Sequence, residues 1–302
     1  MIKQRNLDSS LQNWIMQRGM GAAGFLADGP AGAIGKMYYV NGNGGSDNYD
    51  GESPDTPFDT LDKAFDVVNA RINWSGTPWA THDVILVYPG TYAENLTNLV
   101  YGAKVIGLGF DTRDAQLGAK VKPASGDPVD VGALINSEIH YMGFESPGTG
   151  AAFDAAICNN VLLANCFFTG AAEATTAVYA FYTEDTTRLH MLGCQFCNAD
   201  NGAYFNYADG GDGCNYLLME GCIISGCSAT GIYTHTNLVG PHSIVRDCDI
   251  FGGGQTLAIG VDDNAGILEL SRLSITATDP VAGCRGANAC YGNGSLLGSD
   301  GE

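Results

Sequence analysis

Acidic residues recur in the second half of the chain at intervals that could bring their carboxylates together. They form three pairs: Glu184 and Asp185, Asp209 and Asp212, and Asp262 and Asp263. In a chain that stacks its repeats, carboxylates on adjacent coils would lie about 5 Å apart, the separation of retaining glycosidases, and those two coils apart about 9–10 Å, near that of inverting ones. The candidate catalytic residues are therefore Glu184, Asp209, Asp212, Asp262 and Asp263.

The same acids allow two other interpretations. Carboxylates in successive turns can be the solvated surface of an acidic protein, and this is the simplest interpretation. They can also bind Ca²⁺, because hard cations prefer several carboxylate and carbonyl oxygens. The coil between the second and third pairs carries His235 and Asn237 instead of acids.

A row of large apolar residues, mostly tyrosines, precedes the acids. Its members are Phe153, Tyr179, Tyr204, Tyr233 and Ile259. If the row faces outward, its three tyrosines and His235 are candidates for binding a glycan. If it faces inward, it is an aromatic core stack. Phe153 and Ile259 at the two ends of the row favour the core.

A polar loop near the start of the chain could hold a cation. The stretch from Asn41 to Thr56 is rich in oxygen ligands, and Asp47, Asp50 and Asp55 are the candidate Ca²⁺ ligands. Such side chains more often cap their own turns. The sequence contains no Walker loop, no G-x-S-x-G and no H-E-x-x-H motif. We therefore expect no cofactor, and Ca²⁺ is the alternative.

Four cysteines recur at intervals of 28, 28 and 26 residues: Cys166, Cys194, Cys222 and Cys248. The same position is Met142 one repeat earlier and Leu273 one repeat later, which indicates an apolar, internal environment. We therefore interpret the four thiols as small buried hydrophobes. A disulfide ladder and a zinc site are the alternatives. Cys194-x-x-Cys197 has the spacing of zinc ligands, but no second pair completes a site.

Apolar positions repeat on both sides of the cysteine column. Two residues after its members stand Phe144, Phe168, Phe196, Ile224, Ile250 and Ile275, and three residues before them stand Ile139, Leu163, Met191, Met219, Val245 and Leu270. A repeat of about 20–50 residues indicates a solenoid. Strand-like alternation within each repeat predicts a β-solenoid with one coil per repeat, over residues 36–276.

The two ends of the chain differ from the repeats. Residues 1–18 are predicted to form an amphipathic helix with Leu7, Leu11, Trp14 and Ile15 on one face, and a small-residue arm follows to residue 35. We expect this helix and arm to serve docking or oligomerisation. A second helix is expected at about residues 60–72. Residues 277–302 are expected to be an irregular tail.

The charge of the chain excludes some partners. Its 14 Lys and Arg residues face 33 Asp and Glu residues, which gives a formal net charge of −19. Such a surface repels nucleic acid and anionic membranes. No apolar run is long enough for a transmembrane helix, and the first residues lack the apolar segment of a secretory signal. We therefore expect neither nucleic acid nor membrane as a partner.

Three stretches resemble a known family: "YYVNGNGGSDNYDGESPDTPFDTLDKAF", "DVILVYPGTY" and "KVIGLGF". They resemble the start of right-handed parallel β-helix proteins of the pectate-lyase-like superfamily, and the repeats of residues 139–276 resemble the coils of that family. The resemblance implies an all-β, single-stranded right-handed parallel β-helix whose open end is plugged by the helix at about 60–72. That fold carries lyases, hydrolases, esterases and phage tailspikes, so it does not fix a function.

No catalytic residue is transferred through this resemblance. The calcium-binding Asp cluster and Arg or Lys base of pectate lyases, and the Asp, Arg and Gln set of pectin methylesterases, are not recognisable in the sequence. The N-terminal arm and the missing secretory signal favour a phage virion structural protein. It would be a spike, fibre or capsid decoration that binds host-surface glycan.

The resemblance to tailspikes implies a homotrimer, docked to other virion proteins through its arm and assembled in the host cytoplasm. The alternative function is a secreted-type carbohydrate-active enzyme. It would be a polysaccharide lyase or a glycoside hydrolase that uses carboxylates on the flank of the β-helix.

Overall fold

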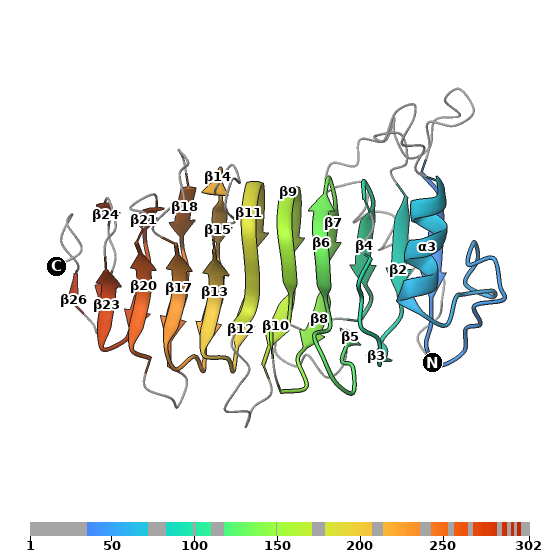
Figure 1. Ribbon diagram of the computed structural model, residues 1–302, viewed down its shortest axis with the longest axis horizontal. Helices are drawn as coiled ribbons and strands as arrows, with labels where there is room; N and C mark the ends of the chain where they lie inside the picture. The colour runs from blue at the N-terminus through green and yellow to red at the C-terminus, as the bar shows by residue number, and fades with distance from the viewer. Residues whose placement is uncertain are drawn as a thin grey trace.

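The chain winds into an elongated parallel β-solenoid, in which successive coils follow one another along a single axis (Figure 1). The computed structural model describes residues 35–71, 83–98, 101–109, 118–148, 150–170, 179–206, 214–235, 243–252, 257–264, 268–282, 286–288, 291–292 and 295–296. Its strands form one 16-stranded and one 10-stranded sheet. Every strand pair in the described ranges is parallel except the last, so the predicted parallel β-helix is confirmed.

Most coils add strands to both sheets. The first sheet contains β1 (Met37–Val40), β2 (Val84–Val87), β4 (Lys104–Gly107), β6 (Asp130–Ile135), β7 (Glu138–His140), β9 (Asp154–Ala164), β11 (Tyr179–Leu192), β13 (Asn201–Phe205), β14 (Cys214–Asn215), β15 (Leu218–Glu220), β17 (Thr230–Thr234), β18 (Ser243–Arg246), β20 (Ile259–Asp263), β21 (Leu268–Ser271), β23 (Asp279–Ala282) and β24 (Gly286–Asn288). The second contains β3 (Gly90–Tyr92), β5 (Ala119–Val121), β8 (Met142–Glu145), β10 (Phe167–Thr169), β12 (Gln195–Cys197), β16 (Ile223–Ser225), β19 (Asp249–Phe251), β22 (Ser274–Thr276), β25 (Tyr291–Gly292) and β26 (Ser295–Leu296).

Inward-facing side chains stack from coil to coil and form the core. The apolar column predicted after the cysteines lies in register: Phe144, Phe168, Phe196, Ile224, Ile250 and Ile275. Within it the Phe168 ring stacks on Phe144 at 5.5 Å and on Phe196 at 5.2 Å. Each of these side chains is at most 2% exposed. The solenoid is therefore held by a continuous dry stack, as the sequence predicts.

The cysteine column lies inside the same core. Its six members, from Met142 through the four thiols to Leu273, are each at most 1% exposed. The Sγ atoms of Cys166 and Cys194 donate to carbonyl oxygens of the preceding coil, those of Ile139 and Leu163, each at 3.3 Å. All seven cysteines whose side chains the structure describes are free. The interpretation of the four thiols as buried hydrophobes is confirmed.

A left-handed residue stands before every member of the cysteine column and turns the chain toward the second sheet. These residues are Tyr141, Asn165, Gly193, Gly221, Asp247 and Arg272, with φ between 52° and 63°. Glycine adopts this conformation without cost, and Asn and Asp tolerate it. The corner is thus a fixed backbone feature of the coil, which keeps the columns of side chains aligned.

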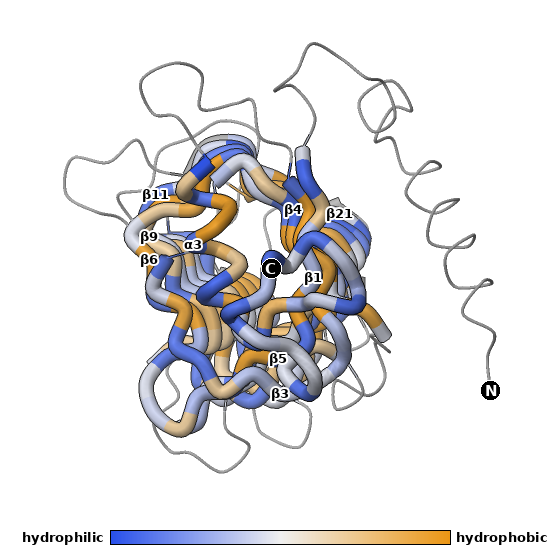
Figure 2. Tube along the Cα trace, turned by 90° about the vertical axis from the view of Figure 1, so that its right-hand side faces the viewer, coloured by the Kyte–Doolittle hydropathy of each residue, from blue (hydrophilic) through white to orange (hydrophobic). Residues whose placement is uncertain are grey.

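The helix α3 (Leu61–Arg71) covers the N-terminal end of the solenoid (Figures 1 and 2). It buries one apolar face against the first coil: Leu61, Ala64, Phe65 and Val68. The Glu94 carboxylate accepts hydrogen bonds from the first backbone amides of the helix, those of Leu61 at 3.1 Å and Asp62 at 2.9 Å. A helix is present where the sequence predicts one, and it shields an apolar cross-section from water.

Two further predictions concern the N-terminal and C-terminal segments of the chain. The predicted docking helix, with Leu7, Leu11, Trp14 and Ile15, lies outside the described residues. The C-terminal segment was expected to be irregular, but β23, β24 and β25 continue the parallel pairing of the coils before them. Backbone pairing needs no apolar periodicity, so the sequence pattern does not reveal these strands. No helix in the described ranges is long and apolar enough to span a membrane.

Candidate functional site

One outward position of the first sheet repeats on six neighbouring strands. Its members pair in register and are Asp130, Asp154, Tyr182, Tyr204, Tyr233 and Asp262. We call this row the flank column; all six side chains are at least partly exposed. With neighbouring strands about 4.8 Å apart, the row extends over about 24 Å along the solenoid axis. It presents carboxylates at both ends and three tyrosines between them.

A pocket of about 450 Å³ opens at the N-terminal end of the flank column. We call it the acidic pocket, because it is lined by four carboxylates: Asp127, Asp130, Asp154 and Glu184. The rings of Tyr179 and Tyr182 form the wall toward the other tyrosines. Within β11, Tyr182 and Glu184 stand two positions apart and so share one face of the strand. The pocket and the tyrosines are therefore one continuous surface.

Asp154 has the most perturbed carboxyl group of the acidic pocket. Burial raises its pKa to about 7, and the nearby charges of Asp130, Asp127 and Glu184 act in the same direction. Burial also raises the pKa of Asp127, with a further contribution from Asp130. A carboxylic acid that keeps its proton near neutral pH can act as a general acid.

A short hydrogen-bond chain holds Glu184 in place. The Asn206 amide donates to the Tyr182 hydroxyl at 2.7 Å, and that hydroxyl donates to Oε1 of Glu184 at 3.1 Å. Burial raises the pKa of Tyr182 to about 12, so its hydroxyl keeps its proton. The next coil thus orients a carboxylate of the acidic pocket through a neutral phenol.

The tyrosines of the flank column stack on one another. The ring centroids of Tyr204 and Tyr233 lie 4.1 Å apart at 11°, and those of Tyr182 and Tyr204 lie 5.9 Å apart at 13°. Because each stacked face is covered by its neighbour, the stack presents ring edges and hydroxyls to solvent. Tyr179 is tilted by 53° against Tyr204, at 4.6 Å, and its ring lines the pocket. The surface can therefore offer hydroxyl hydrogen bonds and one ring at the pocket wall.

The preference for an aromatic core row was wrong for the tyrosines. Tyr179, Tyr204 and Tyr233 are half-buried on the outside, whereas Phe153 lies in the core and stacks on Phe181 at 5.5 Å. Tyr182, and not Tyr179, pairs in register with Tyr204. The predicted row mixed two faces of the strands, because the loops between coils differ in length and the sequence does not show where each strand begins.

The predicted acids do not form one ridge. Glu184 lies in the acidic pocket, but Asp262 lies on β20, three strand steps from β11 and so about 14 Å along the axis. Asp263 is buried and accepts hydrogen bonds from the Thr234 hydroxyl at 2.6 Å and the Leu268 amide at 2.8 Å. The acids were also expected in turns, yet these three lie within strands.

The other predicted site residues lie around this surface or beyond the described part of the chain. Asp209 and Asp212 fall outside the described residues. His235 directly follows β17 and is half-buried, two positions beyond Tyr233. Of the predicted glycan-binding residues, Tyr204 and Tyr233 thus belong to the flank column, whereas Tyr179 and His235 lie beside it, and glycan binding by them stays a prediction.

Three acids of the pocket were missed from the sequence: Asp127, Asp130 and Asp154. A signal for one of them exists, since Asp154 stands twelve residues before Cys166 and Tyr182 stands twelve residues before Cys194. Alignment on the cysteine column would have placed Asp154 beside Tyr182. An acid and a tyrosine differ in charge and size, so a pattern of similar residue types does not reveal that they occupy equivalent positions.

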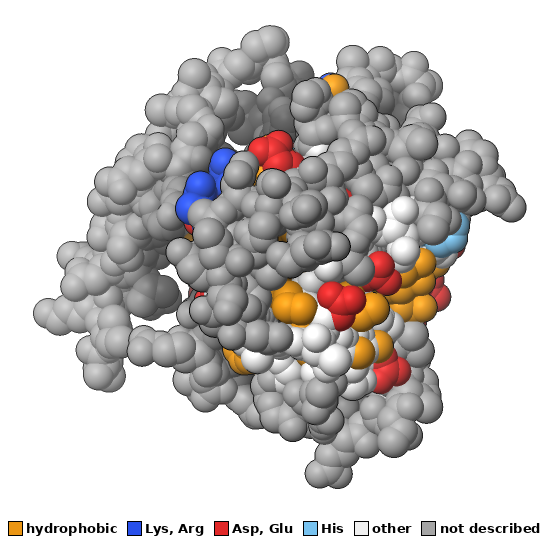
Figure 3. All heavy atoms as spheres, turned by 90° about the vertical axis from the view of Figure 1, so that its left-hand side faces the viewer, with side chains coloured by type: hydrophobic (Ala, Val, Ile, Leu, Met, Phe, Trp, Pro, Cys, Tyr) orange, Lys and Arg blue, Asp and Glu red, His pale blue; other side chains and the backbone are white. Residues whose placement is uncertain are grey.

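Acidic side chains also lie beside hydrophobic ones at the far end of the solenoid, on the described part of the surface over the last strands (Figure 3). Two arginines near this end form ion pairs: Arg246 with Glu220 at 2.9 Å and Arg272 with Asp247 at 2.5 Å. These pairs project from positions outside the flank column. The carboxylate-rich character of the flank is therefore not cancelled by these arginines.

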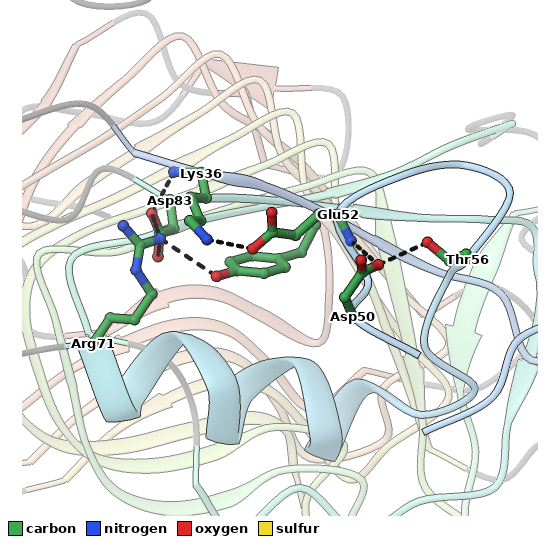
Figure 4. A network of polar contacts seen from close by, with 7 residues as sticks. Lys36, Asp50, Glu52, Thr56, Arg71 and Asp83 are labelled. Carbon is green, nitrogen blue, oxygen red and sulfur yellow. Dashed lines mark hydrogen bonds and ion pairs between the residues drawn. The ribbon is translucent and has the colours of Figure 1, made fainter. Parts of the chain in front are cut away.

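Two of the three candidate Ca²⁺ residues, Asp47 and Asp50, use their carboxylates to hold the N-terminal loop itself. Asp47 accepts hydrogen bonds from the backbone amides of Asp59 and Thr60, both at 3.0 Å. Asp50 accepts from the Thr56 hydroxyl at 2.7 Å (Figure 4). The backbone amide of Asp55 bonds to the Ser53 hydroxyl at 3.0 Å. Among the residues that the structure describes, no three acidic, His or Cys side chains are grouped as metal ligands.

Comparison with known proteins gives similarity to solved structures alone. No protein-family profile matches the chain, and no curated protein sequence does. A pectin methylesterase variant in complex with a hexasaccharide is 13% identical, with a TM-score of 0.46 over 87% of this chain and 91% of the other. The pectin methylesterase from Aspergillus niger is 14% identical, with a TM-score of 0.44 over 89% and 88%. At these identities neither structure indicates a substrate or a reaction for this chain.

Proposed function

We propose that this protein binds a polysaccharide along the flank column and cleaves a glycosidic bond in the acidic pocket. The observation that carries the proposal is the register of Asp130 with Asp154 on neighbouring strands, beside a row of tyrosine hydroxyls. A pocket with a few convergent polar groups is the usual form of a small-molecule site. Four carboxylates and two phenol rings around one pocket suit a sugar better than a metal or a nucleotide.

The two register-paired acids have the environments that glycoside hydrolysis requires. Asp154 is half-buried and keeps its proton near neutral pH, whereas Asp130 is exposed. Neighbouring strands are about 4.8 Å apart, close to the roughly 5–5.5 Å between the carboxyl groups of retaining glycosidases. The half-buried Asp154, whose pKa burial raises, is therefore the candidate acid, and the exposed Asp130 beside it is the candidate nucleophile.

The reaction follows from these roles. Asp154 protonates the glycosidic oxygen, and the Asp130 carboxylate forms a bond to the anomeric carbon as the leaving sugar departs. Water then attacks the glycosyl–enzyme bond, Asp154 takes the proton of that water, and the Asp130 carboxylate is released. Glu184, held by Tyr182, lies in the same pocket and can accept a hydrogen bond from a sugar hydroxyl.

Release of reducing ends from a panel of polysaccharides tests the proposal. We expect the wild-type chain to release them and Asp154→Asn to lose activity by about 10²–10⁴-fold, because general acid catalysis contributes that much. Asp249→Asn is the matched control, since Asp249 is an exposed carboxylate on the second sheet. Equal activity of Asp154→Asn and the wild type would remove Asp154 from the reaction.

Glycan binding without cleavage is the second candidate function. The stacked tyrosines extend two strands beyond the acidic pocket, which suits a binding surface as well as an active site. This is the surface that a virion spike or capsid decoration would use to hold host-surface glycan. Docking through residues 1–35 and a trimeric assembly remain predictions. Glycan binding with no release of reducing ends would favour this function over hydrolysis.

A further inference from the structure

The charge of the flank limits the kind of polysaccharide that fits it. The acidic pocket carries four carboxylates, and no Lys or Arg side chain is among the described residues that line it. In the described part of the chain, the ion pairs of lysines and arginines are with acids outside the pocket. The pocket thus has a net negative charge that no described cation neutralises.

This excess charge acts on the pocket itself. Asp130, Asp127 and Glu184, which line the same pocket, all disfavour the charged form of Asp154. A ligand that brought a positive charge would relieve this repulsion and form charge-assisted hydrogen bonds with the carboxylates. A uronate or sulfate group would add to the repulsion.

The remainder of the flank column also favours a positively charged ligand. Beyond the three tyrosines stands Asp262, four strand steps or about 19 Å from Asp154. A chain that lies along the axis would meet carboxylates at both ends and neutral phenol hydroxyls between them. This pattern suits a polymer whose sugars carry hydroxyls throughout and positive charges at intervals.

We infer that the polysaccharide is a cationic amino glycan, a polymer with free amino groups such as a glucosamine chain, which the pocket carboxylates bind through its ammonium groups. The inference rests on the proposed function, because it names the substrate of the same surface. It goes beyond that function, which a neutral glycan would satisfy equally.

Binding of three oligosaccharides of equal length to the full chain tests the inference. They are a glucosamine oligomer, its N-acetylated counterpart and a galacturonate oligomer, compared by calorimetry. We expect the glucosamine oligomer to bind at least tenfold more tightly than the N-acetylated one, and the galacturonate oligomer to bind least. Raising the salt concentration should weaken the glucosamine complex, because salt screens exposed charges.

A matched pair of variants ties the preference to the pocket. Glu184→Gln removes one pocket charge and should reduce the preference for the glucosamine oligomer by about threefold or more. Glu269→Gln, which changes an exposed acid on β21, should leave the preference unchanged. The salt dependence of the wild-type complex tests the contribution of charge to binding, and this measurement needs no variant.

The outcomes separate the inference from the proposed function. Equal or tighter binding of the N-acetylated or galacturonate oligomer overturns the inference and leaves a glycan site in place. No binding of any oligomer, together with no release of reducing ends from the polysaccharide panel, overturns both.

Discussion

At the scale of single residues, Asp154 on the flank column is expected to lower the stability of the folded chain while it serves the reaction. Asp154 is half-buried among three other carboxylates, so its charged form is disfavoured where it stands. Groups held in an unfavourable state of this kind cluster at functional sites, because a shifted pKa supplies the protonation state that a reaction needs. Replacing such a group commonly raises stability and removes activity.

The pH dependence of stability tests this expectation for Asp154. Its pKa of about 7 in the folded chain exceeds the value of about 3.9 for an unperturbed Asp, so the folded state holds the proton more tightly. Stability contributed by the protonated group is therefore lost as the pH rises from about 4 through about 7. Asp154→Asn does not titrate and should gain in Tm over the wild type across this range, most at pH 8.

Thermal unfolding at pH 4, 6 and 8 makes the measurement. Asp249→Asn is the control, and its Tm difference from the wild type should not grow with pH. A Tm difference for Asp154→Asn that is the same at all three pH values would contradict the perturbed environment of Asp154.

At the scale of elements, an ion pair between Arg71 and the buried Asp83 links the helix α3 to the first strands of the solenoid. The Asp83 carboxylate is fully buried and accepts hydrogen bonds from Nη1 of Arg71 at 2.7 Å and from the Lys36 amide at 2.6 Å (Figure 4). Burial raises the pKa of Asp83 even though Arg71 lowers it. The pair joins the C-terminus of α3 to the residue before β2, and so fixes the helix over the first coil.

Arg71→Ala should destabilise the folded chain by about 3 kcal/mol or more, because it leaves a buried carboxylate without its charged partner. Asp66→Asn, which changes an exposed side chain of the same helix, should change stability by less than about 0.5 kcal/mol. Urea unfolding of both variants provides the comparison. Similar losses in the two variants would show that the ion pair does not hold the helix.

On the scale of the whole molecule, stability comes from the columns that run along the solenoid. Phe168 stacks between Phe144 and Phe196 and meets Phe153 and Phe181 edge to face. Each coil thus contacts its neighbours through the same inward positions, as expected of a repeat protein. The strands of the flank column carry core residues on their other face, so the same stack positions the flank.

Phe168→Ala should lower the free energy of unfolding by about 3–5 kcal/mol, because it opens a cavity in the middle of the stack. The matched control is Phe251→Ala, since the Phe251 side chain is 38% exposed on a strand of the same sheet. That change should cost less than about 0.5 kcal/mol. Equal losses measured by chemical unfolding would contradict the continuous stack.

The core could be predicted from the sequence because its intervals are regular. Cys166, Cys194 and Cys222 are separated by 28 residues each, and apolar residues hold fixed offsets from them. Burial constrains these positions to be apolar on every coil, so the pattern survives along the chain. The helix at about 60–72 follows from its own amphipathic spacing in the same way.

The flank could not be predicted as well, because an outward position is not restricted to one residue type. Asp154, Tyr182 and Tyr204 are equivalent in the fold but share neither charge nor hydropathy. Asp154 and Tyr182 each stand twelve residues before a cysteine of the column, but Tyr204 stands eighteen residues before Cys222, so a constant offset fails from that coil on. The acidic pocket also takes Asp127 from the loop before β6, where no repeat exists.

The most direct test of the site is a crystal structure of Asp154→Asn with a bound oligosaccharide from the polysaccharide that the wild-type chain cleaves. We expect the sugar chain to lie along the flank column, with its scissile bond between Asp130 and the substituted residue and its hydroxyls at Tyr182, Tyr204 and Tyr233. An oligosaccharide bound on the second sheet or at an end of the solenoid, with the acidic pocket empty, would contradict this expectation.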